Sequence, residues 1–386
     1  MKIVALSQYY LPGSGGGTIR ALANVVERFA SRHEFWIVTT DRDVAATSPY
    51  RGVATGQWTT VGAAHVYYDE QRRLTRRVIE QLTREVVPDL IHPVSLFSPL
   101  TVKALLSRRA GRLAVPMLIA PHGEFSPGAL AQKAAKKAAF LTMARAAGMF
   151  RDISWQATSE HEAAEIRRAL GKDTIVRLAP VLPPPIAQIE TAPPLPKSPG
   201  AVRLLYLSRL TPKKNLHFLI ERLSGLRGTV ELDVVGPADD TAYAARCRAA
   251  VAQLPSNVAV RFLPEVAHAQ VASAYAARHV LVLPTLGENF GFVVLEALAG
   301  GRPVIVSDRT PWRGLQSAGV GWDLDLAAPE RWAQVLQQCV DLSADRYDAL
   351  CTNAARYARE AIDVPAIDAA FDAALIASAR AAKLTV

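Results

Sequence analysis

Two glutamates that follow an apolar segment are the first candidates for chemistry. The stretch Gly287-Glu-Asn-Phe-Gly-Phe-Val-Val-Leu-Glu-Ala297 places Glu288 and Glu296 eight positions apart, directly after the apolar run Val280–Pro284. The run predicts a buried strand, and the apolar spacing from Gly291 to Ala299 predicts a helix. The start of such a helix attracts phosphate or sugar oxygens. Glu288 is then placed to contact ligand hydroxyls, and Glu296, about two turns later, can accept hydrogen bonds from a diol.

Glutamate is also common on solvated helix faces, which is the alternative interpretation of this spacing. The surrounding residues weigh against it, because Phe290, Phe292 and Val293–Leu295 leave the predicted helix almost no polar face. A carboxylate inside such a helix is costly unless it is paired or faces a site.

Two cations follow the first predicted strand of the second half of the chain. The segment Tyr206-Leu-Ser-Arg-Leu-Thr-Pro-Lys-Lys-Asn215 carries Arg209 and Lys214 into the loop after the strand Val202–Leu207. Arginine binds phosphate oxygens bidentately and lysine acts as a point charge, so the pair suits a nucleotide diphosphate. Such cations would stabilise the charge that builds on a leaving diphosphate. A surface cluster of ion pairs is the alternative.

Loops after strands of the first half supply further candidates. Gly15, Gly16 and Gly17 join the first predicted strand to the first helix and allow a close backbone approach to a ligand. A dinucleotide fingerprint fits poorly, because Thr18 takes the place of its last glycine. In Pro121-His-Gly-Glu-Phe-Ser-Pro127, His122 is placed either to donate to a sugar hydroxyl or to serve the structure. Ser159 and Glu160 are expected to cap the next helix.

Two D-x-D patterns, Asp41-Arg-Asp43 and Asp323-Leu-Asp325, raise the question of a divalent metal. Such pairs are frequent by chance, and Arg42 would oppose a cation beside Asp41. Arg209 and Lys214 already supply the charge that a metal would bring. We therefore expect no metal and no cofactor.

Strands and helices alternate along both halves, which predicts an α/β fold with parallel sheets covered on both faces. Sharp enrichment in proline between residues 180 and 200 indicates a linker. The expected domains are 1–185, 201–365 and a last helix over 366–386 that returns to the first domain, with a proline-rich linker at 186–200. The elements expected in the first domain are strands at Ile3–Ser7, Glu34–Thr39, Val53–Trp58, His65–Tyr68, Asp89–Pro93 and Pro116–Ala120, and helices at Thr18–Ala30, Arg73–Val86 and Pro99–Arg109.

The stretch from Glu288 to Glu296 closely resembles the E-x7-E signature of the GT4 family of retaining glycosyltransferases, and Arg209 with Lys214 is similar to its R-x4-K element. The resemblance extends along nearly the whole chain and implies the GT-B architecture: two doubly wound Rossmann-like domains facing across a cleft. It also implies transfer of a sugar from a nucleotide-diphosphate sugar, mainly on the second domain, to an acceptor on the first. Retention in such enzymes needs no dedicated nucleophile, because the leaving phosphate helps to deprotonate the incoming hydroxyl.

The resemblance also assigns roles to residues. The catalytic group it implies is Glu288, His122, Arg209 and Lys214, with His122 in a positioning role; the donor-binding group is Gly16, Gly17, Arg209, Lys214, Asn289, Phe290, Gly291 and Glu296. Lys213 departs from the family, which often has an acidic residue there, and adds positive charge near the phosphates.

The charge and the cysteine content of the chain limit its expected partners and cellular location. The chain of 386 residues has a net charge of +9, and residues 1–190 hold 24 Lys and Arg against 16 Asp and Glu, while the remainder holds 20 against 19. This excess indicates attraction to anionic lipid or a phosphate-bearing acceptor, or else solvated helix faces. Nucleic acid is not expected, because aromatics are not interleaved with the charges. Three cysteines without metal spacing favour a cytoplasmic protein, peripheral on the inner face of the membrane.

Two alternatives to a glycosyltransferase of cell-surface polysaccharide synthesis stay open. A nucleotide-sugar epimerase can share the two-domain cleft, but it needs carboxylates placed for elimination and water addition, which we do not find. A non-catalytic protein that binds nucleotide sugars or membrane surfaces would not need all four of Arg209, Lys214, Glu288 and Glu296.

Overall fold

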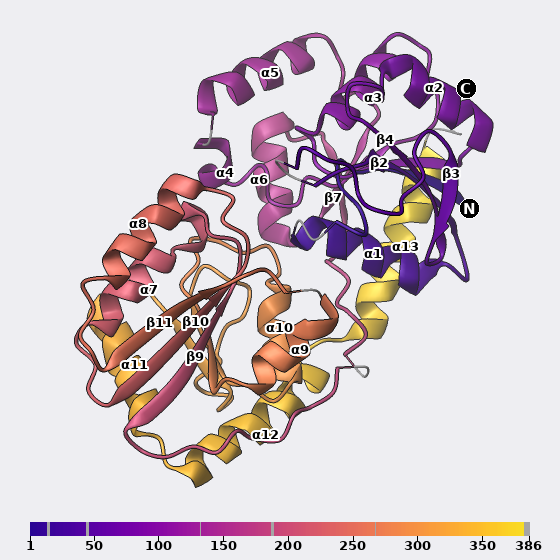
Figure 1. The fold of residues 1–386 in the computed structure, drawn as a ribbon. Helices are drawn as coiled ribbons and strands as arrows, with labels where there is room; N and C mark the ends of the chain where they lie inside the picture. Colours follow the sequence, from indigo (N-terminus) through magenta and orange to yellow (C-terminus); the bar gives the residue numbers. More distant parts are fainter. Residues whose placement is uncertain (14–15, 44–45, 132, 187–188, 267, 382–386) are drawn as a thin grey trace. The chain divides into compact units, whose positions relative to one another are not determined.

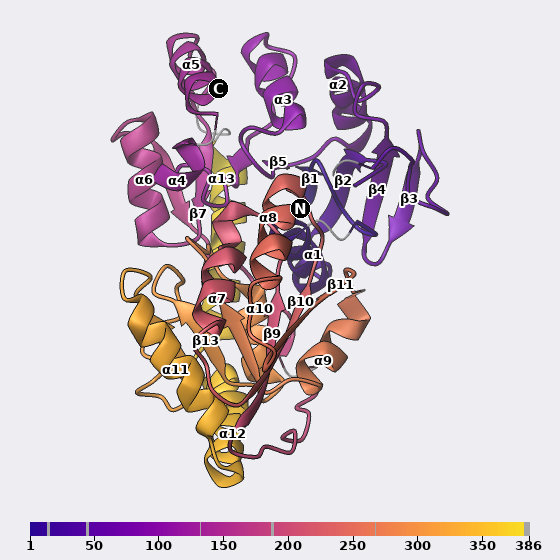
Figure 2. The same cartoon turned by 60° about the vertical axis from the view of Figure 1, so that its left-hand side comes forward.

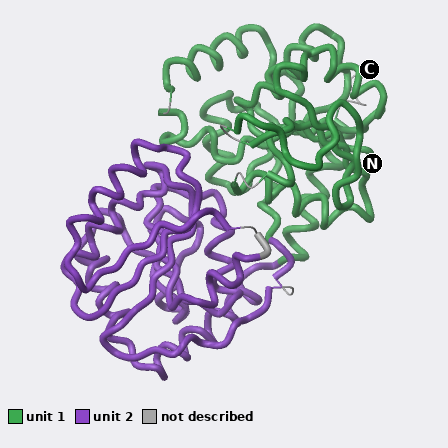
Figure 3. Tube along the Cα trace, viewed as in Figure 1, with its two compact units in different colours: residues 1–183, 364–386 green, residues 184–363 purple. Residues whose placement is uncertain are grey.

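The computed structural model describes residues 1–13, 16–43, 46–131, 133–186, 189–266 and 268–381. The chain divides into two compact units, which Figure 3 shows in separate colours. Unit 1 comprises Met1–Pro183 with Val364–Val386, and unit 2 comprises Pro184–Asp363. The segment predicted as a linker is thus counted within unit 2, and the chain re-enters unit 1 at Val364 rather than at residue 366.

Unit 1 is a largely parallel sheet between two layers of helices. Its strands are β1 (Lys2–Leu6), β2 (Glu34–Thr40), β3 (Trp58–Val61), β4 (Ala64–Asp69), β5 (Leu90–Pro93), β6 (Leu118–Ile119), β7 (Ser154–Ala157) and β8 (Ile175–Leu178). Its helices are α1 (Gly17–Phe29), α2 (Arg76–Val86), α3 (Pro99–Arg109), α4 (Pro127–Ala131), α5 (Ala134–Ala146), α6 (Glu160–Leu170) and α13 (Val364–Ala381). The strand orders are β3-β4-β2-β1-β5 and β6-β7-β8, and isolated parallel bridges extend the pairing from β5 towards β6.

The two hydrophobic cores of unit 1 follow from the alternation of side chains along a strand. On β1, Val4 and Leu6 belong to the core beneath α2 and α3, whereas Ile3 and Ala5 belong to the core beneath α1 and α13. Figures 1 and 2 show α2 and α3 along one side of the sheet and α1 with α13 on the other. Because both faces are covered, these strands are apolar on both sides, which is why they read as apolar runs.

Helix α13 is tied to unit 1 by charge as well as by packing. Arg28, in the last turn of α1, contacts Asp368 at 3.1 Å, and Arg32, just after α1, contacts Asp372 at 2.7 Å. The Phe371 ring stacks on Phe29 in the core, with ring centroids 5.8 Å apart.

Unit 2 is a six-stranded parallel sheet in the order β11-β10-β9-β12-β13-β14. The strands are β9 (Ala201–Leu207), β10 (Thr229–Val235), β11 (Val258–Leu263), β12 (Val280–Leu283), β13 (Val304–Ser307) and β14 (Gly321–Leu324). The helices are α7 (Leu216–Leu223), α8 (Thr241–Val251), α9 (His268–Ala276), α10 (Phe292–Ala299), α11 (Pro329–Asp341) and α12 (Ala344–Glu360), with a 3-10 turn, η2, at Pro212–Lys214. Figure 1 shows α7, α8 and α11 on one face of this sheet and α9 and α10 on the other.

Several predicted element boundaries need correction. Val53–Trp58 is not a strand except at its last residue, because β3 is the antiparallel edge segment Trp58–Val61. The helix expected from Arg73 begins at Arg76, since Thr75 accepts a hydrogen bond from the Val78 amide and caps it. Helices α4 and α5 were not predicted; no side chain of α4 and only Ala144 of α5 is buried, so neither shows a clear apolar face.

Candidate active site

The strand order of unit 2 decides where its functional loops meet. β9 pairs with β10 on one side and β12 on the other, so the chain reverses its direction of winding between β9 and β12. Ligands of open α/β sheets bind at the carboxyl ends of the strands beside such a reversal. The loops that leave this point carry residues 208–215 after β9 and 284–291 after β12. These are the two segments that the sequence motifs indicated.

The two loops contact each other through a lysine and a glutamate. The Lys214 ammonium donates to Oε1 of Glu288, and the two side chains are 17% and 12% exposed. Main-chain contacts fix the same junction, because the Leu286 amide donates to the Lys213 carbonyl at 2.8 Å. The Tyr206 hydroxyl donates to the Lys214 carbonyl at 3.3 Å. The ion pair therefore lies on a rigid, half-buried support.

The second predicted cation of this edge has its own carboxylate. Nη1 of Arg209 donates to Oδ2 of Asp239 at 3.0 Å, with side chains 44% and 23% exposed. Asp239 lies in the loop after β10, the strand next to β9. An exposed ion pair of this kind contributes little to stability, so the guanidinium can exchange its partner for a ligand anion at small cost.

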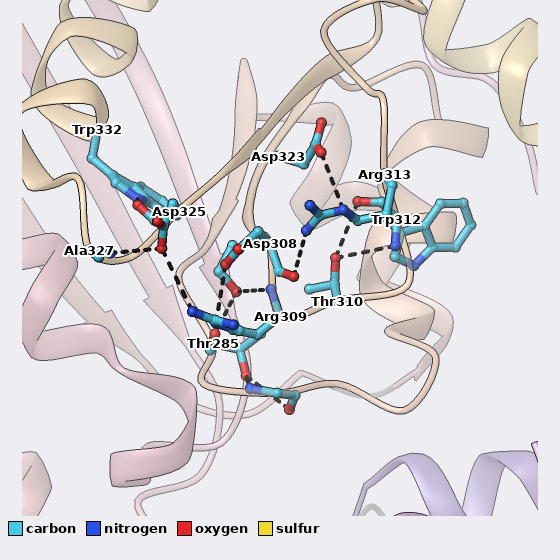
Figure 4. A network of polar contacts seen from close by, with 12 residues as sticks. Thr285, Asp308, Arg309, Thr310, Trp312, Arg313, Asp323, Asp325, Ala327 and Trp332 are labelled. Carbon is cyan, nitrogen blue, oxygen red and sulfur yellow. Dashed lines mark hydrogen bonds and ion pairs between the residues drawn. The ribbon is translucent and has the colours of Figure 1, made fainter. Parts of the chain in front are cut away.

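A third loop, after β13, holds the glutamate loop in place and was not predicted. The Glu288 amide donates to the Arg309 carbonyl at 3.0 Å, and the Trp312 indole donates to the Phe290 carbonyl at 2.6 Å. Gly291 has a φ of 82°, and a Cβ there would lie 3.3 Å from the same indole nitrogen, so glycine fits this position. Figure 4 shows this loop and its polar contacts.

Ion pairs also link the third loop to nearby carboxylates. Arg309 contacts Asp308 at 3.2 Å and Asp325 at 3.7 Å, and Arg313 contacts Asp323 at 3.6 Å (Figure 4). The available sequence signal was the position of this loop, which follows a strand adjacent to β12 and therefore opens at the same edge of the sheet.

Glu296 lies on α10, beyond the loop that carries Glu288. Its Oε2 accepts a hydrogen bond from the Tyr275 hydroxyl at 3.3 Å, and this hydroxyl also lies 3.0 Å from the Val293 carbonyl. Burial raises the pKa of Tyr275 well above its ordinary value, and the Glu296 carboxylate raises it further. Tyr275 thus stays a neutral donor that orients Glu296, and sequence reasoning did not single it out.

The predicted residues of the first domain all belong to unit 1. His122 follows β6 in a left-handed conformation with a φ of 49°. Its neighbour Gly123 donates its amide to Glu162 at 2.5 Å, which ties the loop to α6. Burial lowers the pKa of His122 and the Glu162 carboxylate opposes that shift, so the neutral imidazole is favoured. Of the two residues expected to cap α6, Ser159 does so, since its hydroxyl accepts from the Glu162 amide at 3.2 Å, whereas Glu160 is the first residue of the helix.

Of the glycine-rich segment, Gly16 and Gly17 are described and Gly15 lies outside the described residues. Gly16 precedes α1 with a φ of 102°, and Gly17 is the exposed first residue of that helix. Among the residues that the structure describes, no side chain caps α1, so its first amide groups are open to other partners.

The carboxylates of the two D-x-D patterns have protein partners. Arg42 binds Asp41 through Nε at 2.8 Å and Nη2 at 3.1 Å. Asp323 accepts from the Leu315 amide at 2.9 Å and the Gly314 amide at 3.2 Å. Among the described residues, no group of three or more His, Cys, Asp or Glu side chains is arranged to hold a metal ion. No helix in the described part of the chain combines the length and hydropathy needed to cross a bilayer.

The segment that carries Arg209, Lys214, Glu288 and Glu296 matches a known family. Residues 201–345 fit the family model described as Glycosyl transferases group 1. This segment is similar to the group 1 glycosyl transferases. The match confirms the resemblance to GT4 enzymes that the E-x7-E and R-x4-K motifs indicated.

Curated relatives match part of the chain. A D-inositol 3-phosphate glycosyltransferase of Geodermatophilus obscurus is 34% identical over 28% of this chain and 26% of its own length. The O-antigen chain mannosyltransferase RfbU of Salmonella typhimurium is 34% identical over 25% of this chain and 27% of its own length. A phosphatidyl-myo-inositol mannosyltransferase of Mycobacterium leprae is 31% identical over 33% and 34%. The chain therefore spans about a quarter to a third of the length of these relatives.

Solved structures match the whole fold. Sucrose-phosphate synthase from Thermosynechococcus elongatus has a TM-score of 0.71 at 18% identity, covering 95% of this chain and 96% of its own. HepE from Anabaena in complex with UDP-glucose has a TM-score of 0.70 at 20% identity, covering 98% and 100%. These likenesses, with the parallel sheets of the two units described above, confirm the predicted α/β fold of the GT-B class with two Rossmann-like domains.

Proposed function

We propose that this protein is a retaining, metal-independent glycosyltransferase that moves a sugar from a nucleotide-diphosphate sugar to a hydroxyl of a glycan or lipid-linked acceptor. The observation that carries the proposal is the contact between Lys214 and Glu288 at the point where the winding of unit 2 reverses, with Arg209 in the same loop as Lys214. A cation beside a carboxylate at this edge suits a ligand that joins a phosphate to a polyhydroxylated sugar.

Each side chain then has a distinct task. Arg209 and Lys214 stabilise the negative charge that develops on the diphosphate as the bond to the sugar breaks. Glu288, held half-buried by Lys214 and by the Arg309 carbonyl, accepts hydrogen bonds from the sugar hydroxyls. Glu296, oriented by Tyr275, accepts from the ribose diol of the nucleoside. His122, as a neutral imidazole, donates a hydrogen bond that positions either the acceptor substrate or the sugar being transferred.

Retention and metal independence complete the proposal. The leaving phosphate takes the proton of the incoming hydroxyl on the same face of the sugar, so no protein nucleophile is required. Arg209 and Lys214 provide the positive charge that a divalent ion would otherwise supply, and one carboxylate of each D-x-D pattern is already engaged: Asp41 binds Arg42, and Asp323 accepts from backbone amides.

The names of the relatives support the kind of acceptor. The similar proteins of Salmonella typhimurium and Mycobacterium leprae are named for an O-antigen chain and for phosphatidyl-myo-inositol. We therefore place this chain in cell-surface polysaccharide or lipopolysaccharide synthesis, cytoplasmic and peripheral on the inner face of the membrane.

A donor screen tests the proposal directly. We expect at least one of UDP-, GDP-, ADP- and dTDP-sugars to raise the melting temperature of the purified chain, because a ligand that binds only the folded state stabilises it. The stabilising donor should then yield a glycosylated product with lipid-linked acceptors, analysed for anomeric configuration. Excess EDTA should leave the rate unchanged. No stabilisation by any donor would contradict the proposed activity, whereas strong inhibition by EDTA would restore a metal-dependent mechanism.

The basic surface of unit 1 gives a second prediction. Arg72 and Arg73, which precede α2, and Arg77, in its first turn, are exposed, and Arg72 contacts Glu70 at 2.6 Å. Charges near an anionic membrane contribute about 1 kcal/mol each and are screened by salt. We expect the protein to sediment with anionic vesicles at low salt and to be released by salt.

The matched variants for this sedimentation remove equal charge from the two units. Changing Arg72, Arg73, Arg76 and Arg77 to Gln should abolish most of the binding. The control changes four exposed arginines of unit 2, namely Arg227, Arg246, Arg248 and Arg356. Equal loss in both variants would indicate a nonspecific charge effect, and no binding by the wild type would point to a soluble acceptor.

A further inference from the structure

Lys213 lies at the centre of the junction between the two loops of unit 2. Its carbonyl accepts hydrogen bonds from the Leu286 amide at 2.8 Å and the Thr285 hydroxyl at 3.2 Å. Its side chain extends over Gly287, because Cε lies 3.9 Å from the position that a Cβ would take there. The backbone of Lys213 is thus fixed beside Glu288, and its ammonium is carried along the same edge.

The charges of this junction do not balance without a ligand. Lys214 is paired with Glu288, and Arg209 is paired with Asp239. The ammonium of Lys213 has no hydrogen-bond or ion-pair partner within the part of the chain that the structure describes. Three cations therefore face two carboxylates, and the excess positive charge belongs to Lys213.

The environment of this ammonium favours an incoming anion. Although the side chain as a whole is exposed, surrounding protein atoms remove part of its hydration and lower the pKa of Lys213. Lys214 and Arg209 lower the pKa further, and Glu288 opposes them. An anion bound here would relieve the repulsion among three neighbouring cations.

Lysine also suits the geometry of this contact. Its ammonium is a compact charge on a flexible stem, which can follow phosphate oxygens without the fixed fork of a guanidinium. The Lys214–Glu288 pair can then remain intact, so that Glu288 keeps the orientation it needs at the sugar.

We propose that Lys213 binds the diphosphate of the donor directly, as the one of the three cations Arg209, Lys213 and Lys214 that has no ion-pair partner among the described residues. This inference rests on the proposed use of a nucleotide-diphosphate sugar and assigns a binding role to a residue outside the R-x4-K pattern. Lys213 is accordingly a donor-affinity residue, and its replacement should affect diphosphates far more than monophosphates.

The test is titration calorimetry on the full chain with UDP, GDP, ADP and dTDP and with the corresponding monophosphates. Lys213→Gln should weaken the preferred nucleoside diphosphate about tenfold or more, the usual size of a lost charge-assisted contact. Binding of the matching monophosphate should change less than about threefold. Lys213→Arg should restore most of the affinity, and the wild type should lose more affinity with added salt than Lys213→Gln does.

The control is Arg227→Gln, which removes the same charge from an exposed residue just before β10, at the amino end of the same sheet. Unchanged diphosphate affinity in Lys213→Gln, or an equal loss in Arg227→Gln, would overturn the assignment of Lys213 while leaving the proposed function in place. If the wild type binds none of the four diphosphates, the proposed function and this inference fail together.

Discussion

Lys214→Ala should lower turnover by at least tenfold while leaving the fold intact. The ammonium is half-buried against Glu288, and a charge-assisted contact of this kind is worth about 1.5–3 kcal/mol, or one to two decades in rate. The loss has two parts: the leaving diphosphate loses a stabilising cation, and Glu288 loses the partner that orients it. Steady-state kinetics with the donor found in the screen measures the combined effect, because each of the two losses lowers turnover and the specificity constant together.

Glu288→Gln is the second single variant of a double-mutant cycle with Lys214→Ala. It should also reduce turnover, and the double variant should lose less than the sum of the single losses, because the two side chains contact each other. Glu296→Gln should instead raise the Michaelis constant of the donor, since Glu296 lies apart on α10 against Tyr275. Lys172→Ala, an exposed lysine of unit 1, should be neutral. Wild-type kinetics in Lys214→Ala, or strictly additive losses in the double variant, would contradict the site.

The fold could be predicted from sequence where burial on both faces leaves a continuous apolar signal. β12 was predicted from the apolar run Val280–Pro284, because all four residues of the strand, Val280–Leu283, are buried. The helix over Pro99–Arg109 was predicted with its observed bounds, since Ser98 caps it and proline takes its first position. The edge strand β3 lacks this signal, because all of its residues are exposed or half-buried. Its prediction at Val53–Trp58 was wrong for that reason.

The edge of the sheet where the candidate residues of unit 2 lie could be predicted from sequence, but the pairing of their side chains could not. The loops after β9 and β12 were expected at one edge because parallel strands end together, and the strand order places them side by side. The partners of these residues come from elsewhere: Asp239 from the loop after β10, Trp312 from the loop after β13, and Tyr275 from α9. Contacts at such sequence separations depend on strand order, which no local pattern contains.

The proline-rich segment is a second case in which a local pattern does not reveal a contact that is distant in sequence. Its composition indicated a linker, but its carbonyl groups are held by a cation more than a hundred residues away. The guanidinium of Arg302 donates to the carbonyls of Ala192 at 3.3 Å and Pro193 at 2.8 Å. It also donates to Tyr275 and Ala276 near the end of α9, each at 3.1 Å, so one side chain joins this segment to the helix that carries Tyr275.

Arg302→Met should therefore destabilise unit 2 more than any surface change. Arg302 is 1% exposed, and replacing it leaves several carbonyls without a donor, each costing about 1–3 kcal/mol before water relieves some of them. We expect a net loss of about 3 kcal/mol, which corresponds to roughly 6–12 °C in melting temperature for a unit of this size. Arg359→Met is the matched control: Arg359 is exposed and donates to Thr191 of the same segment at 2.8 Å, so its loss should cost less than about 0.5 kcal/mol. Calorimetry that found the two variants equally stable would show that the buried guanidinium does not hold this segment in place.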